Sequence, residues 1–245
     1  MRYRVRGLEI RSENAAKPAS SAGRWMLAWI RSLPRNTKAL DLGCGKLRYA
    51  VPLARRVASV TAVDSTIQLN RKQLLFGKLR SVRSYASTSF RNVQVYALED
   101  TAWRRRRYEI VLCSNVLSAV PCRKTRRAIL RAAAASLAPE GKLLITTQYR
   151  NSHFDGWGAV RSAVRYLDGF LVRGKRGASF YGLLDATSLA RLCRACGLRI
   201  LRAGHVKELA YVLADRATKR ATGNTRTRGI ADRHTTRTLH RTSGS

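Results

Sequence analysis

Two acidic residues that close short apolar runs are the part of this sequence best suited to chemistry. Asp41 precedes a glycine loop at residues 43–45 (Gly-Cys-Gly), and Asp64 ends the apolar run of residues 60–63. Glycine has no Cβ, so the loop lets the backbone approach a ligand closely and adopt positive φ angles without strain. We therefore expect a nucleotide-like cofactor to lie against this loop.

Acidic residues are scarce in the chain, which has 48 Lys and Arg but only 14 Asp and Glu. Between residues 39 and 113 the acidic residues are Asp41, Asp64, Glu99, Asp100 and Glu109, and the first four fall at predicted strand ends. Ligands of an open α/β sheet bind outside the carboxyl ends of its strands. The sequence thus predicts negative charge where a hydroxylated or cationic ligand would bind.

The elements that must position these residues alternate along the chain. We expect strands at residues 39–42, 60–63, 93–97, 108–113 and 142–147, and helices at 47–56, 67–80 and 124–137. A helix at 188–196 and an antiparallel hairpin of two strands, 198–203 and 208–213, follow an irregular aromatic segment. Alternating strands and helices predict a parallel sheet with helices on both faces.

The chain length of 245 residues suits one sizeable domain with appendages. We expect an N-terminal lid or helical segment at 1–38, with a helix at about 15–33, and a main domain at 39–213. Within it, residues 151–182 form a substrate-side insertion. Residues 214–245 form a basic tail that we expect to be disordered. This tail either contacts an anionic partner or is a dispensable solvated end.

Four motifs together resemble the class I S-adenosylmethionine-dependent methyltransferases, in that family's order and spacing. They are the loop of residues 41–45 (DLGCG), Asp64, residues 108–117 (YEIVLCSNVL) and residues 137–145 (LAPEGKLLI). The resemblance covers about residues 38–213. It implies an α/β fold with a doubly wound, mostly parallel seven-stranded sheet whose last strand is antiparallel, and the cofactor S-adenosyl-L-methionine.

The resemblance also implies a set of cofactor-binding residues. They are Asp41, Gly43, Cys44, Gly45, Asp64, Glu99, Asp100 and Ser114. The glycines would let the backbone contact the methionine portion, and Asp41 would lie near its amino group. Asp64 would accept charge-assisted hydrogen bonds from the ribose hydroxyls. Either Glu99 or Asp100 would lie near the adenine.

Other interpretations of the loop are weaker. Dinucleotide binding needs G-x-G-x-x-G, but Arg48 occupies the third glycine position. The methyltransferases often carry a glycine where this chain has Leu47, so the loop shape is open to test. Taken singly, Asp41 could instead cap the next helix, and Asp64 could be a helix N-cap or turn residue.

The acceptor is less well defined. Methyl transfer is an in-line displacement, so holding the reactants in place supplies much of the catalysis. If a base is needed, the candidate is His153, or a nearby tyrosine, Tyr149 or Tyr181, although a lone histidine is more often structural. The chain lacks the Asn/Asp-Pro-Pro-Tyr/Phe box of adenine and cytosine N-methyltransferases. Cys122, which follows Pro121, lies too far downstream for a cytosine C5 nucleophile and is better explained as part of a helix start. We expect a small-molecule acceptor.

Composition leaves alternatives open. The net charge of +34 attracts phosphate backbones, so an RNA or DNA acceptor, or a non-catalytic nucleic-acid-binding module, is the alternative function. An odd number of five irregularly spaced cysteines suggests reduced thiols in a cytoplasm, with Cys193 and Cys196 packed as small apolar groups rather than binding metal. No apolar run approaches about 20 residues and no export signal is evident, so we expect no membrane partner.

Overall fold

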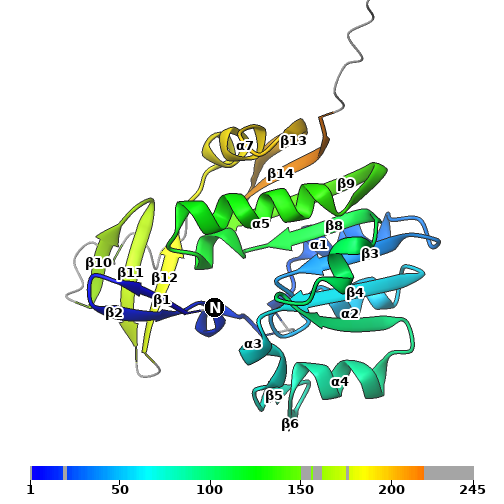
Figure 1. Ribbon diagram of the computed structural model, residues 1–245, viewed down its shortest axis with the longest axis horizontal. Helices are drawn as coiled ribbons and strands as arrows, with labels where there is room; N and C mark the ends of the chain where they lie inside the picture. The colour runs from blue at the N-terminus through cyan, green and yellow to red at the C-terminus, as the bar shows by residue number, and fades with distance from the viewer. Residues whose placement is uncertain (1, 19–20, 150–155, 157–161, 175–176, 218–245) are drawn as a thin grey trace, which may run out of the picture.

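The computed structural model describes residues 2–18, 21–149, 156, 162–174 and 177–217 and is dominated by one large sheet (Figure 1). The sheet has seven strands in the order β13-β14-β9-β8-β3-β4-β7. The strands are β3 (Lys38–Leu42), β4 (Ser59–Asp64), β7 (Val93–Ala97), β8 (Tyr108–Ser114), β9 (Leu137–Gln148), β13 (Leu198–Val206) and β14 (Leu209–Arg216). Only β14 runs antiparallel to its neighbours in this sheet. The predicted doubly wound sheet with an antiparallel last strand is confirmed.

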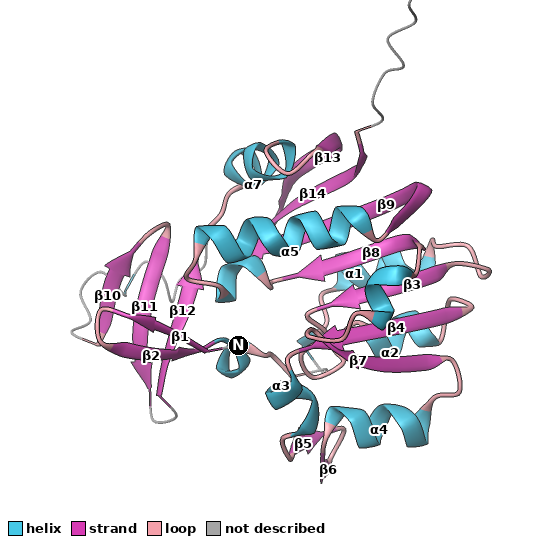
Figure 2. Cartoon of the chain, in the orientation of Figure 1, coloured by secondary structure: helices cyan, strands magenta, loops and turns pink. Residues whose placement is uncertain are grey.

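Helices cover both faces of this sheet (Figure 2). They are α1 (Arg24–Arg31), α2 (Ala50–Ala54), α3 (Thr66–Asn70), α4 (Val82–Ser89), α5 (Arg123–Ala135) and α7 (Ala186–Arg194). Successive side chains of a strand point to opposite faces. Accordingly, Leu40 and Leu42 pack with α5 and α7 in one core cluster, whereas Ala39 packs with α1 and α2 in another. Burial on both faces explains the nearly continuous apolar run of β3.

The predicted helix over residues 67–80 is wrong. The structure has the short helix α3, then a hairpin of β5 (Gln73–Leu75) and β6 (Lys78–Arg80), then α4. The two turn residues Phe76 and Gly77 both have positive φ, of 48° and 81°, which is the backbone of a tight two-residue hairpin. Ser81 then begins a new helix, because its hydroxyl accepts a hydrogen bond from the Ser84 amide at 3.1 Å.

The N-terminal segment is more varied than a single helix over residues 15–33. Its helix α1 begins only at Arg24, after Gly23 in an extended conformation. Before it come β1 (Arg2–Val5), β2 (Leu8–Arg11) and the short 3-10 helix η1 (Ser12–Ala15). The aromatic and apolar residues of α1 still pack on the sheet, with Met26 and Ile30 fully buried.

A second sheet joins the N-terminal hairpin to the segment after β9. Its order is β1-β2-β12-β11-β10, with β10 (Ala163–Tyr166), β11 (Gly169–Gly174) and β12 (Gly177–Gly182). A buried ion pair ties it to α5, because Arg126 contacts Asp168 through two bonds of 2.5 and 3.0 Å. Figure 1 shows this sheet beside the end of the large sheet at which β3, β4 and β8 finish. Within the described residues, no helix has both the length and the apolar character needed to cross a bilayer.

Candidate functional site

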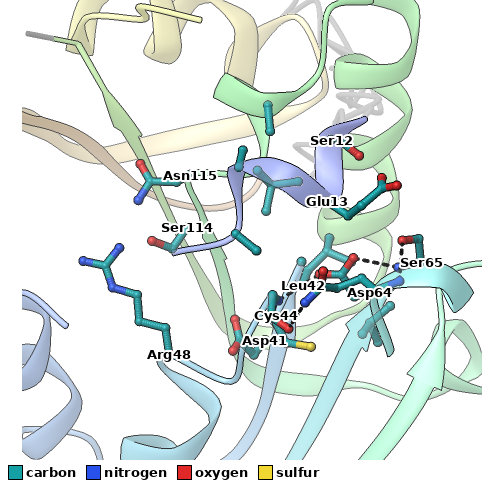
Figure 3. Close-up of a pocket in the computed structure, with 18 of the residues that line it drawn as sticks. Ser12, Glu13, Asp41, Leu42, Cys44, Arg48, Asp64, Ser65, Ser114 and Asn115 are labelled. Carbon is teal, nitrogen blue, oxygen red and sulfur yellow. Dashed lines mark hydrogen bonds between the residues drawn. The ribbon is translucent and has the colours of Figure 1, made fainter. Parts of the chain in front are cut away.

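A pocket opens at the carboxyl ends of β3, β4 and β8 (Figure 3). It holds about 930 Å³ of space free of protein atoms, counting its open mouth. The structure brings six of the predicted cofactor residues into its lining, namely Asp41, Gly43, Cys44, Gly45, Asp64 and Ser114. Glu99 and Asp100 are exposed and do not line it, whereas their neighbour Leu98 does. Neighbouring parallel strands thus gather residues that are far apart in sequence.

The glycine loop is held tightly at the end of β3. The amides of Gly43 and Cys44 both donate to the Val63 carbonyl, at 2.7 and 3.0 Å. Gly43 has a φ of 80°, and a Cβ there would lie 2.2 Å from Cγ2 of Val116. Leu47, at the position where related loops often have glycine, keeps a positive φ of 61° and is fully buried. The loop therefore keeps a left-handed backbone at this position without a glycine, at a cost of about 1–2 kcal/mol.

Asp64 fastens the glycine loop to the start of α3. Its Oδ2 accepts a hydrogen bond from the Gly45 amide at 2.8 Å, and its Oδ1 accepts one from the Ser65 amide at 2.7 Å. Burial raises the pKa of Asp64, while these two amides lower it. Ser65, not Asp64, is the N-cap of α3. The Ser65 side chain also hydrogen-bonds to this carboxylate, so at least one of its about four acceptor sites remains for a hydroxyl donor of a ligand.

Asp41 differs from Asp64 because one of its oxygens has no partner. The residue is 2% exposed, and its Oδ2 is buried without a hydrogen bond from any described residue. Burial raises the pKa of Asp41 to about 7, and the nearby charge of Asp64 raises it too. A hydrogen bond from the Ala50 amide, at the first residue of α2, lowers it. Asp41 thus contacts the helix start and also keeps an unsatisfied oxygen at the pocket, an arrangement that suits a cationic ligand.

Sequence reasoning missed several pocket residues. Asn115 has a φ of 57°, and its buried Oδ1 has no hydrogen-bond partner among the described residues. In Figure 3 it lies with Ser114 on the opposite side of the pocket from Asp64. The Ser114 hydroxyl shares a hydrogen bond of 2.8 Å with Thr146. Asparagine tolerates left-handed backbone, so its place directly after β8 was the available signal.

The N-terminal segment forms a further wall of the pocket, which no local sequence pattern predicted. η1 and the next residues, Ala16 and Lys17, line the pocket across from the glycine loop. The Lys17 ammonium donates to the side-chain oxygen of Gln148 at 3.1 Å, and burial lowers its pKa. On the loop side, Arg48 lies over the ring of Tyr49 at 4.9 Å. Two cations, Lys17 and Arg48, therefore line the pocket together with its buried carboxylates.

His153 lies outside the described residues. The other candidate catalytic groups that the structure describes do not line the pocket. Tyr149 packs against His205 with ring centroids 4.2 Å apart and the rings tilted by 40°, and neither Tyr149 nor Tyr181 lines the pocket. Cys122 is the N-cap residue of α5 and is also absent from the lining. The described residues contain no group of three or more His, Cys, Asp or Glu side chains placed to hold a metal ion.

Comparison with known proteins agrees with this geometry. A family model described as a methyltransferase domain matches residues 13–203. The chain is 38% identical over 212 residues to the uncharacterized protein YmfD of Escherichia coli (strain K12), with 86% of this chain and 95% of that protein covered. It is 27% identical over 201 residues to the ubiquinone biosynthesis O-methyltransferase of Azotobacter vinelandii (strain DJ / ATCC BAA-1303), with coverages of 81% and 80%.

A solved structure shares the fold. It is the Burkholderia thailandensis 1,6-didemethyltoxoflavin-N1-methyltransferase with bound 1,6-didemethyltoxoflavin and S-adenosylhomocysteine. The TM-score is 0.56 at 17% identity, with 81% of this chain and 79% of that chain covered. At this identity the likeness concerns the arrangement of strands and helices.

Proposed function

The chain belongs to the S-adenosylmethionine-dependent methyltransferase family, and we propose that it transfers the methyl group to a small-molecule nucleophile bound beside the glycine loop. The observation that carries this proposal is the pocket that gathers Asp41, Asp64 and the loop at the carboxyl ends of adjacent strands. When bound, S-adenosylmethionine supplies an electrophilic methyl group on a sulfonium sulfur.

The residues of the pocket fit this cofactor. The unpartnered Oδ2 of Asp41 would accept a hydrogen bond from the cofactor's ammonium group, which would remove the cost of an unsatisfied buried carboxylate. Asp64 would accept the ribose hydroxyls on the sites that Gly45 and Ser65 leave free. Leu98, with Glu99 or Asp100 beyond it, would lie near the adenine. Cys44 stays a neutral thiol, because burial raises its pKa.

Catalysis by this chain would rest on positioning. Holding the two reactants at near-attack distance supplies much of the rate acceleration of a displacement reaction. The glycine loop and Asp64 are joined by hydrogen bonds, so they would hold one reactant rigidly. Asn115, on the facing side of the pocket beside Ser114 of the predicted cofactor set, is the polar group that we propose for orienting the acceptor. His153 stays a proposed base for acceptors that must lose a proton.

A small-molecule acceptor is supported by the relatives, which include enzymes named for ubiquinone biosynthesis and for a toxoflavin precursor. The net charge of +34 supports RNA or DNA as the second candidate. Transfer of tritiated methyl groups into a small-metabolite extract, total RNA and DNA separates the two. Labelling confined to the metabolite extract is expected, and dominant labelling of nucleic acid would reverse the order.

Calorimetry with S-adenosylmethionine tests the site itself. Asp64→Ala should weaken binding at least about a hundredfold, because two charge-assisted hydrogen bonds are lost. Asp64→Asn, which keeps one carbonyl oxygen for the loop, should lose less. Asp215→Asn is the matched control, since Asp215 pairs with Arg199 on β13 and β14 and does not line the pocket. Equal binding by all four proteins would remove Asp64 from the site.

A further inference from the structure

The β5–β6 hairpin and the helix α3 before it expose a concentration of large apolar side chains. Seven large apolar side chains of the described chain are exposed, and four of them lie between residues 67 and 79. These are Ile67, Leu74, Phe76 and Leu79, with exposed fractions of 41%, 65%, 46% and 70%. Scattered single apolar residues are normal on a protein surface, but a concentration of this kind marks an interaction site.

The register of the hairpin puts two of these side chains, Leu74 and Leu79, on one face. Leu74 pairs directly with Leu79, so both point away from the protein, whereas Gln73 and Leu75 point inward and are buried. At the turn, Phe76 is 46% exposed and stacks on Tyr85 of α4 with ring centroids 4.7 Å apart, so the hairpin is held against α4 while part of the Phe76 ring stays exposed.

Within its own segment of the chain, this apolar face is flanked only by basic residues. Residues 66–91 contain six basic residues and no acidic one; they are Arg71, Lys72, Lys78, Arg80, Arg83 and Arg91. Lys72 and Lys78 are exposed beside the apolar face. A partner must therefore offer negative charge at its surface and apolar volume directly behind it.

Contrary to the expectation of no membrane partner, which concerned spanning segments, we propose that the β5–β6 hairpin docks on an anionic lipid bilayer, with Leu74, Phe76 and Leu79 entering the headgroup boundary and the flanking lysines and arginines contacting the headgroups. Apolar side chains backed by basic residues are how proteins attach to one leaflet without spanning it. The phosphates of a nucleic acid would bind the basic residues, but the exposed leucines would contribute little to that binding. A second copy of this chain would bring two basic patches together, which is repulsive.

The hairpin is linked to the cofactor loop through α3. Gln73 donates to the backbone carbonyl of Gln68 at 3.2 Å, and the Gln68 side chain donates to the Gly45 carbonyl at 2.7 Å. Figure 1 places the hairpin next to α3, at the end of the sheet where β4 finishes. A bilayer docked on the hairpin would thus lie on the pocket side of the molecule. This proposal does not depend on the identity of the methyl acceptor.

Vesicle sedimentation with the full chain tests the docking. Because the whole chain is basic, binding is measured at about 0.3 M salt, where exposed charges are strongly screened. Phosphatidylglycerol vesicles are compared with phosphatidylcholine vesicles and with heparin, a soluble polyanion. The double variant Leu74→Ser/Leu79→Ser keeps every charge, and Leu201→Ser, a residue 42% exposed on β13, is the matched control.

The wild type and Leu201→Ser should bind phosphatidylglycerol vesicles alike, and the double variant at least about tenfold more weakly. All three should bind heparin equally. A Phe76→Trp variant should add fluorescence that lipid-borne quenchers reduce on vesicles. Equal vesicle binding by the double variant, or no quenching at position 76, would overturn the proposal. So would sedimentation equilibrium that showed a dimer dissociated by the double variant.

Discussion

The segments that follow β3 and β4 leave the same end of the sheet. The first buries its apolar side chains, whereas the second exposes several of them. After β3, Leu47, which follows the glycine loop, and Val51 and Leu53 of α2 are buried. After β4, Leu74 and Leu79 face outward from a hairpin. Both segments contribute to the surroundings of one pocket, since Gln68 links the second to the first. The contrast agrees with the two proposals, in which the first segment holds a ligand inside the protein and the second contacts a partner outside it.

Two glycines make the sharpest test of this contrast. Gly43 and Gly77 have nearly the same φ, 80° and 81°, but a Cβ on Gly43 would overlap Val116 whereas one on Gly77 would meet nothing within 4 Å. Gly43→Ala should lower the free energy of unfolding by about 3–4 kcal/mol, from backbone strain plus overpacking. Gly77→Ala should cost only the strain, about 1 kcal/mol. Urea denaturation measures both.

The double variant Gly43→Ala/Val116→Ala checks the cause. Removing the Val116 methyl groups should recover part of the stability lost by Gly43→Ala, because the overlap is relieved while the φ strain stays. Equal losses at Gly43 and Gly77 would show that the loop after β3 is no more tightly packed than the hairpin.

Neighbouring leucines of β5 separate the two faces of the hairpin. Leu75 is 2% exposed, so Leu75→Ala should lower the free energy of unfolding by about 2–3 kcal/mol. Leu74→Ala should change it by no more than about 0.5 kcal/mol, since Leu74 buries little. Thermal and urea unfolding of the pair provide the measurement. A large loss at Leu74 would mean that the outward leucine stabilises the fold, which would weaken its assignment to a partner.

The pH dependence of Asp41 gives a smaller expected effect on stability than Gly43→Ala or Leu75→Ala. The pKa of Asp41 is raised from 3.8 to about 7, so its ionisation destabilises the folded state above pH 7, and this cost disappears as the pH falls toward 4. Asp41→Asn should therefore raise the free energy of unfolding at pH 8 by about 1–2 kcal/mol and leave it nearly unchanged at pH 4.

Cofactor affinity should follow the same titration in the opposite direction: ionisation of Asp41 lowers stability but should strengthen cofactor binding. If the ionised carboxylate of Asp41 binds the ammonium group, affinity for S-adenosylmethionine should fall by up to about tenfold per pH unit below pH 7. Calorimetry across pH 5.5–8 should find this slope in the wild type and not in Asp41→Asn. The same slope in both proteins would assign the titration to another group.

The local pattern of apolar residues was enough to predict the strands at the centre of the large sheet. β3, β4 and β8 are short apolar runs buried on both faces, and these three strands and the edge strand β7 were each predicted within a few residues. The pattern failed over residues 67–80, where spaced apolar residues fit a helix as well as a hairpin. The decision there lay with Phe76 and Gly77, whose positive φ angles turn the chain.

The sequence by itself determined the order of strands and helices and the acidic and glycine residues at strand ends, because apolar periodicity and the absence of a Cβ act locally. Only the tertiary structure decided which groups share the pocket. Lys17, Asp41 and Asn115 meet there because the N-terminal segment crosses the ends of strands that are parallel neighbours. It also decided that one oxygen of Asp41 has no partner and that Leu74 faces outward, since burial depends on residues distant in the chain.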